Sequence, residues 1–183
     1  IESSAIPWLL ACVLVTAAPH AEHLPLWLSL VGASACLGRF WLWHRHGALP
    51  KRWLLALFVI VGVFAIVREH RTLFGRDAGV ALLFFFMALK PMEIRTRRDA
   101  LVLIMLGYFL LLTHYLFSET IPTGLWLLFS ATLLTATLIR LYGGHQPIPA
   151  LLRQAGVLLL QAAPFMLILF VLFPRIQGPL WGL

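Results

Sequence analysis

The polar residues that could do chemistry in this sequence stand at the borders of long apolar runs. Thr113 and His114 are adjacent and lie near the end of one such run. A titratable side chain inside an apolar segment is a functional-site hypothesis, because an isolated charge there is costly. A proton relay would need polar partners in other runs, and the sequence offers few. Packing near a membrane interface is therefore the alternative role for His114.

A charged segment from Arg68 to Asp77 is the densest one on the side that we expect to be extracytoplasmic, and it ends in Arg76 and Asp77. These charges could contact an extracytoplasmic domain or a polar substrate. In the alternative interpretation, arginine and acidic side chains pair with one another in a solvated loop. We keep Arg76 and Asp77 as candidate functional or structural residues.

Lys90 and Glu93 lie at the other border, three residues apart, which is the spacing of neighbours on a helix. Pro91 between them interrupts a regular helix. We interpret the pair as an anchor that folds a loop, with the Lys90 stem along apolar surface and its ammonium group in water. A catalytic role is the less favoured alternative.

Two further patterns resemble reactive sites only superficially. His20, Glu22 and His23 have a spacing seen at metal sites, but they fall in a short turn without a further ligand set, so we expect a solvated turn. Cys12 and Cys36 lie inside apolar runs and are expected to be small packing residues. With no arrangement of nucleophile, base and orienting group, we assign no catalytic residue, metal or cofactor to this chain.

The amino-acid composition indicates that membrane segments position these polar residues. Of the 183 residues, 61% are hydrophobic and 11% are charged, with a mean hydropathy of +0.93. Soluble domains average roughly 45–50% apolar and about 25% charged residues, so the surplus must face lipid. The net charge of +7 comes from Lys and Arg between apolar runs. Such residues are typical of topology signals and lipid contacts, and we expect no nucleic-acid partner.

Seven apolar runs predict an all-α fold, a polytopic transmembrane helix bundle of about seven spans. A spanning helix needs about 20 residues, so the first and fourth runs are short, and six spans is the alternative. The predicted runs are Ile6–Ala18, Leu24–Trp43, Trp53–Val67, Ala78–Leu89, Ala100–Phe117, Ile121–Leu141 and Gly156–Phe173.

The positive residues predict the orientation of the bundle. If the N-terminus is cytoplasmic, ten Lys and Arg residues fall in inner connections and four fall outside. The tryptophans lie near the ends of the runs, as an interfacial aromatic belt requires. We therefore expect a multi-pass protein of the bacterial inner membrane, with the C-terminal end of this chain in the periplasm.

The segment Phe173–Leu183 contains two prolines, which forbid a regular helix, and it carries Arg175 and Trp181, both suited to a membrane–water boundary. Because it follows a long apolar run and because residue 1 is Ile, we expect a fragment of a larger protein. We predict a transmembrane helical domain over residues 1–172 and an exit segment over residues 173–183.

Three stretches resemble the N-terminal membrane domain of bacterial transglutaminase-like proteins of the TgpA type. In that family the membrane helices lead into a periplasmic transglutaminase-like domain, whose Cys–His–Asp triad forms an acyl-enzyme. The resemblance implies an aminoacyltransferase for the whole protein, although no triad residue lies in this chain. The stretches are Phe173–Gly182, Arg98–Leu101 leading to Gly107–His114, and Gly79–Leu83 followed by Leu89–Lys90 and Glu93–Arg95.

The function that we expect is a membrane domain that anchors and orients a periplasmic transglutaminase-like acyltransferase linked to the cell envelope. Its expected partners are membrane lipids, its own catalytic domain and cell-envelope proteins. Two alternatives from other classes are a lipid or small-molecule transporter or flippase, which needs a polar cavity, and a scaffold for cell-wall machinery.

Overall fold

The chain is a bundle of seven α-helices, seen in a computed structural model that describes residues 5–71, 75–114, 117, 120–143 and 146–172. Within these ranges there is no β-strand, so the predicted all-α fold is confirmed. Two short 3-10 helices complete it. The elements are α1 (Ile6–Ala17), η2 (Ala18–Glu22), α2 (Leu26–His44), α3 (Arg52–His70), α4 (Arg76–Leu89), η3 (Lys90–Met92), α5 (Arg97–His114), α6 (Ile121–Gly143) and α7 (Ile148–Leu172).

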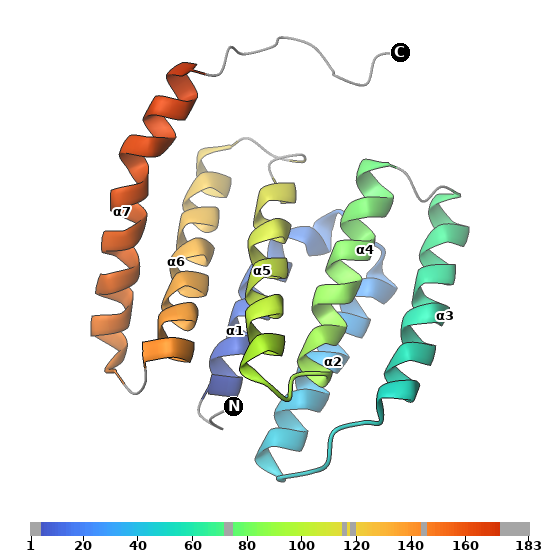
Figure 1. Cartoon of the computed structure of the whole chain (residues 1–183). Helices are drawn as coiled ribbons and strands as arrows, with labels where there is room; N and C mark the ends of the chain where they lie inside the picture. The colour runs from blue at the N-terminus through green and yellow to red at the C-terminus, as the bar shows by residue number, and fades with distance from the viewer. Residues whose placement is uncertain (1–4, 72–74, 115–116, 118–119, 144–145, 173–183) are drawn as a thin grey trace.

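The helices form two layers (Figure 1). The front layer contains α3, α4, α5, α6 and α7 in spatial order, and α1 and α2 lie behind it. Each helix of the front layer packs on its neighbour, while α2 packs against α4, and α1 packs against α5 and α6. Helix α4 is therefore covered on three sides and is one of the most buried elements of the bundle.

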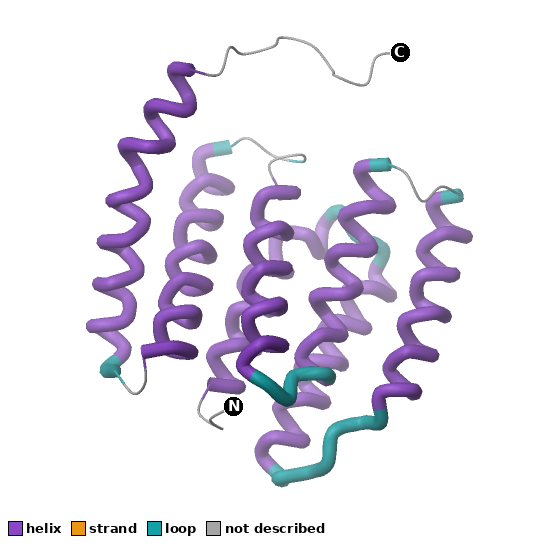
Figure 2. Tube along the Cα trace, in the orientation of Figure 1, coloured by secondary structure: helices purple, strands orange, loops and turns teal. Residues whose placement is uncertain are grey.

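The connections divide between two ends of the bundle. The links α2–α3, α4–α5 and α6–α7 lie at one end, which we call the basic end because Lys51, Arg52, Lys90 and Arg95 lie there. Helices α3 and α5 end, and α4 and α6 begin, at the other end of the bundle, at the top of Figure 2. We call it the histidine end, because α5 finishes there at His114.

Four helices are long and apolar enough to cross a membrane, judged by length and composition within the described residues. They are α2, α3, α6 and α7, and α1, with its 3-10 extension, forms a shorter apolar helix. In α3 and α7 most large apolar side chains are exposed, as a surface that contacts lipid tails would require. The predicted membrane-type bundle is thus supported, whereas the exact number of spans stays a prediction.

Helix α7 differs most from its predicted run. It begins at Ile148 rather than Gly156, because Pro149 is acceptable in a first turn and the polar residues Arg153 and Gln154 continue the helix. Apolarity alone misses such an amphipathic first part. The helix continues through Pro164, which lies inside it.

Candidate functional site

The histidine end brings together side chains that are far apart in sequence. After α1, the 3-10 helix η2 begins at Ala18 with Pro19 in its first turn, and it turns His20 into the bundle, where His20 is 1% exposed. His20 Nε2 lies 3.3 Å from Thr113 Oγ1, and the Thr113 hydroxyl donates to the Leu110 carbonyl. Thr113 thus connects the His20 ring of η2 to the last turn of α5.

His114 is the second buried histidine of this end. It is 5% exposed, its ring centroid lies 5.0 Å from that of His20, and its Nδ1 has no hydrogen-bond partner among the described residues. Burial, and after it the neighbouring His114, lower the pKa of His20, which stands in the connecting turn, to about 4. His20 is therefore neutral at physiological pH.

The cluster extends outward through aromatic contacts. The exposed His23 ring lies 6.5 Å from His114 and 4.9 Å from Phe117, and the Arg76 guanidinium stacks over Phe117 at 4.7 Å. We define the histidine cluster as His20, His23, His114, Phe117 and Arg76. It links the α1–α2 turn to the end of α5 and the beginning of α4.

A cavity of about 370 Å³ opens beside the histidine cluster. Its walls include His23, His114 and Glu22, together with Thr123 and Trp126 from α6. Among the described residues no three His, Cys, Asp or Glu side chains gather closely enough to hold a metal ion. The cavity walls therefore present hydrogen-bonding side chains and the aromatic ring of Trp126 to a polar group.

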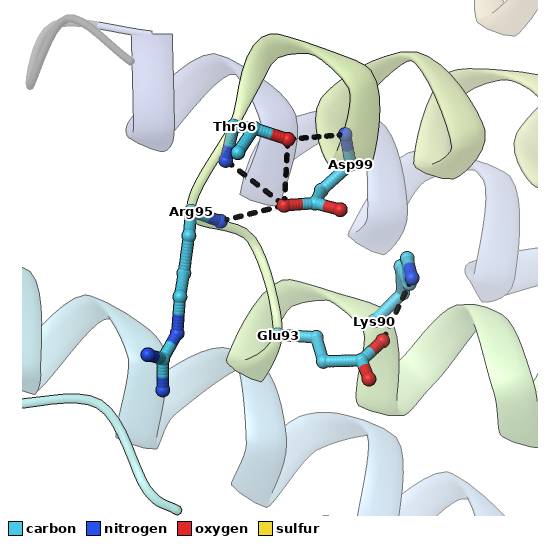
Figure 3. Close-up of polar contacts among 5 residues, drawn as sticks. All are labelled: Lys90, Glu93, Arg95, Thr96 and Asp99. Atoms are coloured by element: carbon cyan, nitrogen blue, oxygen red, sulfur yellow. Dashed lines mark hydrogen bonds and ion pairs between the residues drawn. The ribbon is translucent and has the colours of Figure 1, made fainter. Parts of the chain in front are cut away.

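The basic end holds the second group of polar contacts (Figure 3). Lys90 Nζ and Glu93 Oε2 form an ion pair of 2.7 Å across the 3-10 helix η3. The two residues, three apart in the sequence, are thus in contact, and Pro91 between them stands in a 3-10 rather than an α-helical turn. Half-exposed pairs of this kind contribute about 0–1 kcal/mol, and this one joins the two ends of the turn between α4 and α5.

Asp99 closes the beginning of α5. Its Oδ2 accepts from the backbone N–H groups of Arg95 and Thr96, at 3.1 and 2.9 Å, and from the Thr96 hydroxyl. The Asp99 N–H donates back to Thr96 Oγ1 at 3.3 Å, which makes a reciprocal capping box. Arg95 also donates to the Pro50 carbonyl at 3.2 Å, and this bond ties the α4–α5 turn to the segment before α3.

The candidate residues therefore divide between the two ends. Arg76, Thr113 and His114 gather at the histidine end, and Asp77 forms an exposed 3.1 Å ion pair with Arg76. Lys90 and Glu93 gather at the basic end. Arg175 and Trp181 lie outside the residues that the structure describes.

Sequence reasoning missed two members of the histidine cluster. We expected a solvated turn at residues 20–23. The expectation holds for His23, which is exposed, but it is wrong for His20. The 3-10 helix η2 packs His20 against the end of α5, where it is buried. Phe117 was assigned only to an apolar run. A histidine directly after a proline at the end of an apolar run was the available signal, and spacing alone could not connect it to His114.

These features define a class, a helical domain of membrane type whose polar groups gather at its two ends. The sequence model of the family described as "TgpA N-terminal domain" matches residues 8–183, so the chain belongs to this family. The resemblance seen in the sequence is confirmed.

A relative from Pseudomonas aeruginosa, named protein-glutamine gamma-glutamyltransferase, is 39% identical over 183 residues. The alignment covers 98% of this chain and 27% of the relative, so the chain spans about a quarter of that protein's length. No solved structure matches the chain.

Proposed function

We propose that this chain forms the membrane domain that anchors and orients a periplasmic transglutaminase-like acyltransferase of the Cys–His–Asp type. The family match over residues 8–183 carries the proposal, together with the name of a relative of which this chain covers only 27%. In this proposal residues 1–172 hold the protein in the inner membrane and residues 173–183 lead to the catalytic domain.

The orientation in the proposal comes from charge. Ten of the fourteen Lys and Arg residues lie in or near the links of the basic end, and such links tend to stay in the cytoplasm. The N-terminus then lies in the cytoplasm, and the histidine end faces the periplasm. This is the side on which a catalytic domain that follows α7 would stand.

The histidine end supplies a surface on which that domain can rest. His23 and Arg76 are exposed there, next to a cavity of about 370 Å³ that is lined in part by Glu22 and Thr123. Aromatic and arginine side chains are typical of protein interfaces. We therefore propose that the periplasmic catalytic domain docks over the histidine cluster and is oriented by it.

A photo-crosslinking experiment on the full-length protein tests this arrangement. A photoreactive amino acid replaces His23 in one variant and Arg97, exposed at the basic end, in a matched control. Because only the first position faces the catalytic domain, we expect peptides of that domain to be crosslinked to position 23 alone, as identified by mass spectrometry. Crosslinks from position 97, or from neither position, contradict the proposed docking.

The enzymatic part of the proposal has its own measurement. Full-length protein should incorporate a primary amine into a glutamine-containing acceptor peptide, and substitution of the predicted catalytic cysteine, which lies outside this chain, should abolish incorporation. Amine incorporation that persists in that variant would contradict a transglutaminase-like mechanism.

The transporter or flippase alternative gains less support. It needs a polar path through the bundle, whereas the cavity of about 320 Å³ between α1, α2 and α4 is lined mostly by apolar side chains such as Leu14, Phe84 and Met87. The scaffold alternative would use the charged segment from Arg68 to Asp77 as its contact surface. Within that segment Arg76 pairs with Asp77 and stacks on Phe117.

A further inference from the structure

A groove runs along the surface of the bundle between α3 and α5, with α4 as its floor. Its volume is about 560 Å³, which falls within the range of roughly 300–1,000 Å³ that is typical of ligand sites. Most of its walls are apolar, contributed by Leu55, Val59, Ile60, Phe86, Val102 and Leu106. We call it the α3–α5 groove.

The groove exists because α3 packs mainly on α4. The two helices approach closely where Gly62 faces the Phe85 ring, and that contact holds α3 in place. The flank of α3 toward α5 stays uncovered, and Ile60 is 66% exposed there. Since α3 is long and apolar enough to cross a membrane, this flank faces hydrocarbon, so the occupant of the groove must itself be apolar along its length.

The length of the groove matches a single lipid leaflet. Along α3 its lining extends from Arg52 to Ile60, which is about 12 Å at the rise of an α-helix. One leaflet contributes half of a hydrocarbon core of about 30 Å. An acyl chain that begins at the basic end therefore runs along the groove to a depth close to the bilayer centre.

One end of the groove is charged. Arg52 and Lys90 line it together with Glu93, which is paired with Lys90 at 2.7 Å. Lys51 is the neighbour of Arg52 in the chain, and Arg95 is held nearby by its bond to the Pro50 carbonyl. Cations outnumber the single carboxylate at this mouth, so it favours an anionic headgroup over a zwitterionic one.

We propose that the α3–α5 groove binds one anionic phospholipid, with its phosphate at Arg52 and Lys90 and one acyl chain along Val59 and Phe86. Basic pockets between helices on the cytoplasmic side suit such headgroups. The site lies wholly within α3, α4, η3 and α5, so the proposal does not depend on the catalytic domain. The bound lipid would fill the gap between α3 and α5 and stabilise the position of α3.

The test compares two lipids and two kinds of variant. Phosphatidylglycerol and phosphatidylcholine with identical chains are titrated onto the protein in neutral detergent, and bound lipid is counted by native mass spectrometry. Arg52→Gln removes a mouth charge while leaving the Lys90–Glu93 pair intact. Ala56→Phe fills the groove, whose wall includes Ala56, without changing any charge.

Matched controls make the same changes outside the groove. Arg97→Gln removes a charge at the same end of the bundle, and Val61→Phe adds the same ring type to an exposed position of α3. Neither residue lines the groove. Thermal unfolding of each variant in detergent verifies that it is folded before lipid is added.

We expect phosphatidylglycerol to bind more tightly than phosphatidylcholine. Arg52→Gln should weaken its binding about fivefold, the effect of one Lys or Arg near an anionic lipid surface. Ala56→Phe should lower the affinity for phosphatidylglycerol by a similar factor, because the phenyl ring blocks the acyl chain from the groove and only the headgroup contacts remain. Equal affinity for the two lipids, an equal loss in Arg97→Gln, or an unchanged affinity in Ala56→Phe would overturn the proposal.

Discussion

At the scale of single residues, most polar side chains serve the backbone and the packing of helices. The hydroxyl groups of Thr132, Thr135 and Thr137 each donate to a carbonyl one turn earlier in α6. Thr135 and Thr137 also meet Tyr108 and Cys12 across helix interfaces, at 2.6 and 3.0 Å. Such bonds between helices contribute modestly, about 1 kcal/mol each, and they explain why polar residues occur inside apolar runs.

The capping box of α5 gives a quantitative prediction. Asp99→Ala leaves the N–H groups of Arg95 and Thr96 without their acceptor, so we expect the free energy of unfolding to fall by about 1 kcal/mol. Thermal or denaturant unfolding in detergent measures the change. Asp99→Asn, which keeps an acceptor oxygen, is the matched control and should lose less.

The pH dependence of the same cap has a definite sign. The N–H groups of Arg95 and Thr96 lower the pKa of Asp99, which lies before the apolar part of α5. The carboxylate therefore contributes stability above its unfolded pKa, and the contribution is lost as the pH falls through the lowered folded value. A loss in Asp99→Ala that is larger in acid than at neutral pH would contradict this assignment.

The capping box and the histidine pair differ in how far the sequence could predict them. Thr96 and Asp99 are three residues apart, a local pattern that reports a helix start. His20 and His114 are joined only by the packing of η2 under α5, and nothing in their spacing predicts it. Local polar contacts are thus accessible from sequence, whereas contacts between helices need the fold.

At the scale of elements, α3 is a helix that packs mainly on one neighbour, α4. Its apolar residues are mostly exposed, and its buried residues are Gly62 and Ile66. Gly62 admits the ring of Phe85, which is fully buried in α4. One small residue therefore allows the close approach of two helices, in keeping with the role of glycine at membrane helix interfaces.

A methyl group at this contact should separate the two helices. A Cβ at position 62 overlaps the Phe85 ring, so we expect Gly62→Ala to lower the free energy of unfolding by about 1–3 kcal/mol, the usual effect of overpacking. Gly79→Ala in α4 is the matched control, because a Cβ there meets no atom within 4 Å. Equal stability of Gly62→Ala and the wild type in detergent unfolding would contradict the contact.

The sequence predicted the helices better than their arrangement. Each of the seven predicted runs corresponds to a helix, and the largest error is the start of α7, at Ile148 instead of Gly156. The layers could not be predicted, because a helix in lipid is apolar both where it packs and where it faces lipid. A helix such as α3 therefore carries little periodic signal that marks its buried face.

At the scale of the whole molecule, the distribution of polar groups gives the bundle a direction. Ten of the fourteen Lys and Arg residues lie in or near the links of the basic end, whereas Arg68, Arg71 and Arg76 lie toward the end that holds the histidine cluster. Positive residues near helix ends tend to remain in the cytoplasm. This asymmetry underlies both the proposed orientation of the catalytic domain and the proposed lipid site.

Thiol labelling tests that direction directly. The native Cys12 and Cys36 are buried, so wild-type protein provides a low background from this chain. His23→Cys should react with a membrane-impermeant thiol reagent in intact spheroplasts, because His23 is exposed at the histidine end. Arg97→Cys should react only after the membrane is permeabilised, since position 97 is exposed at the basic end. The reverse pattern would place the basic end in the periplasm. The proposed docking of the catalytic domain at the histidine end, and the position of the α3–α5 groove in the cytoplasmic leaflet, would then both be contradicted.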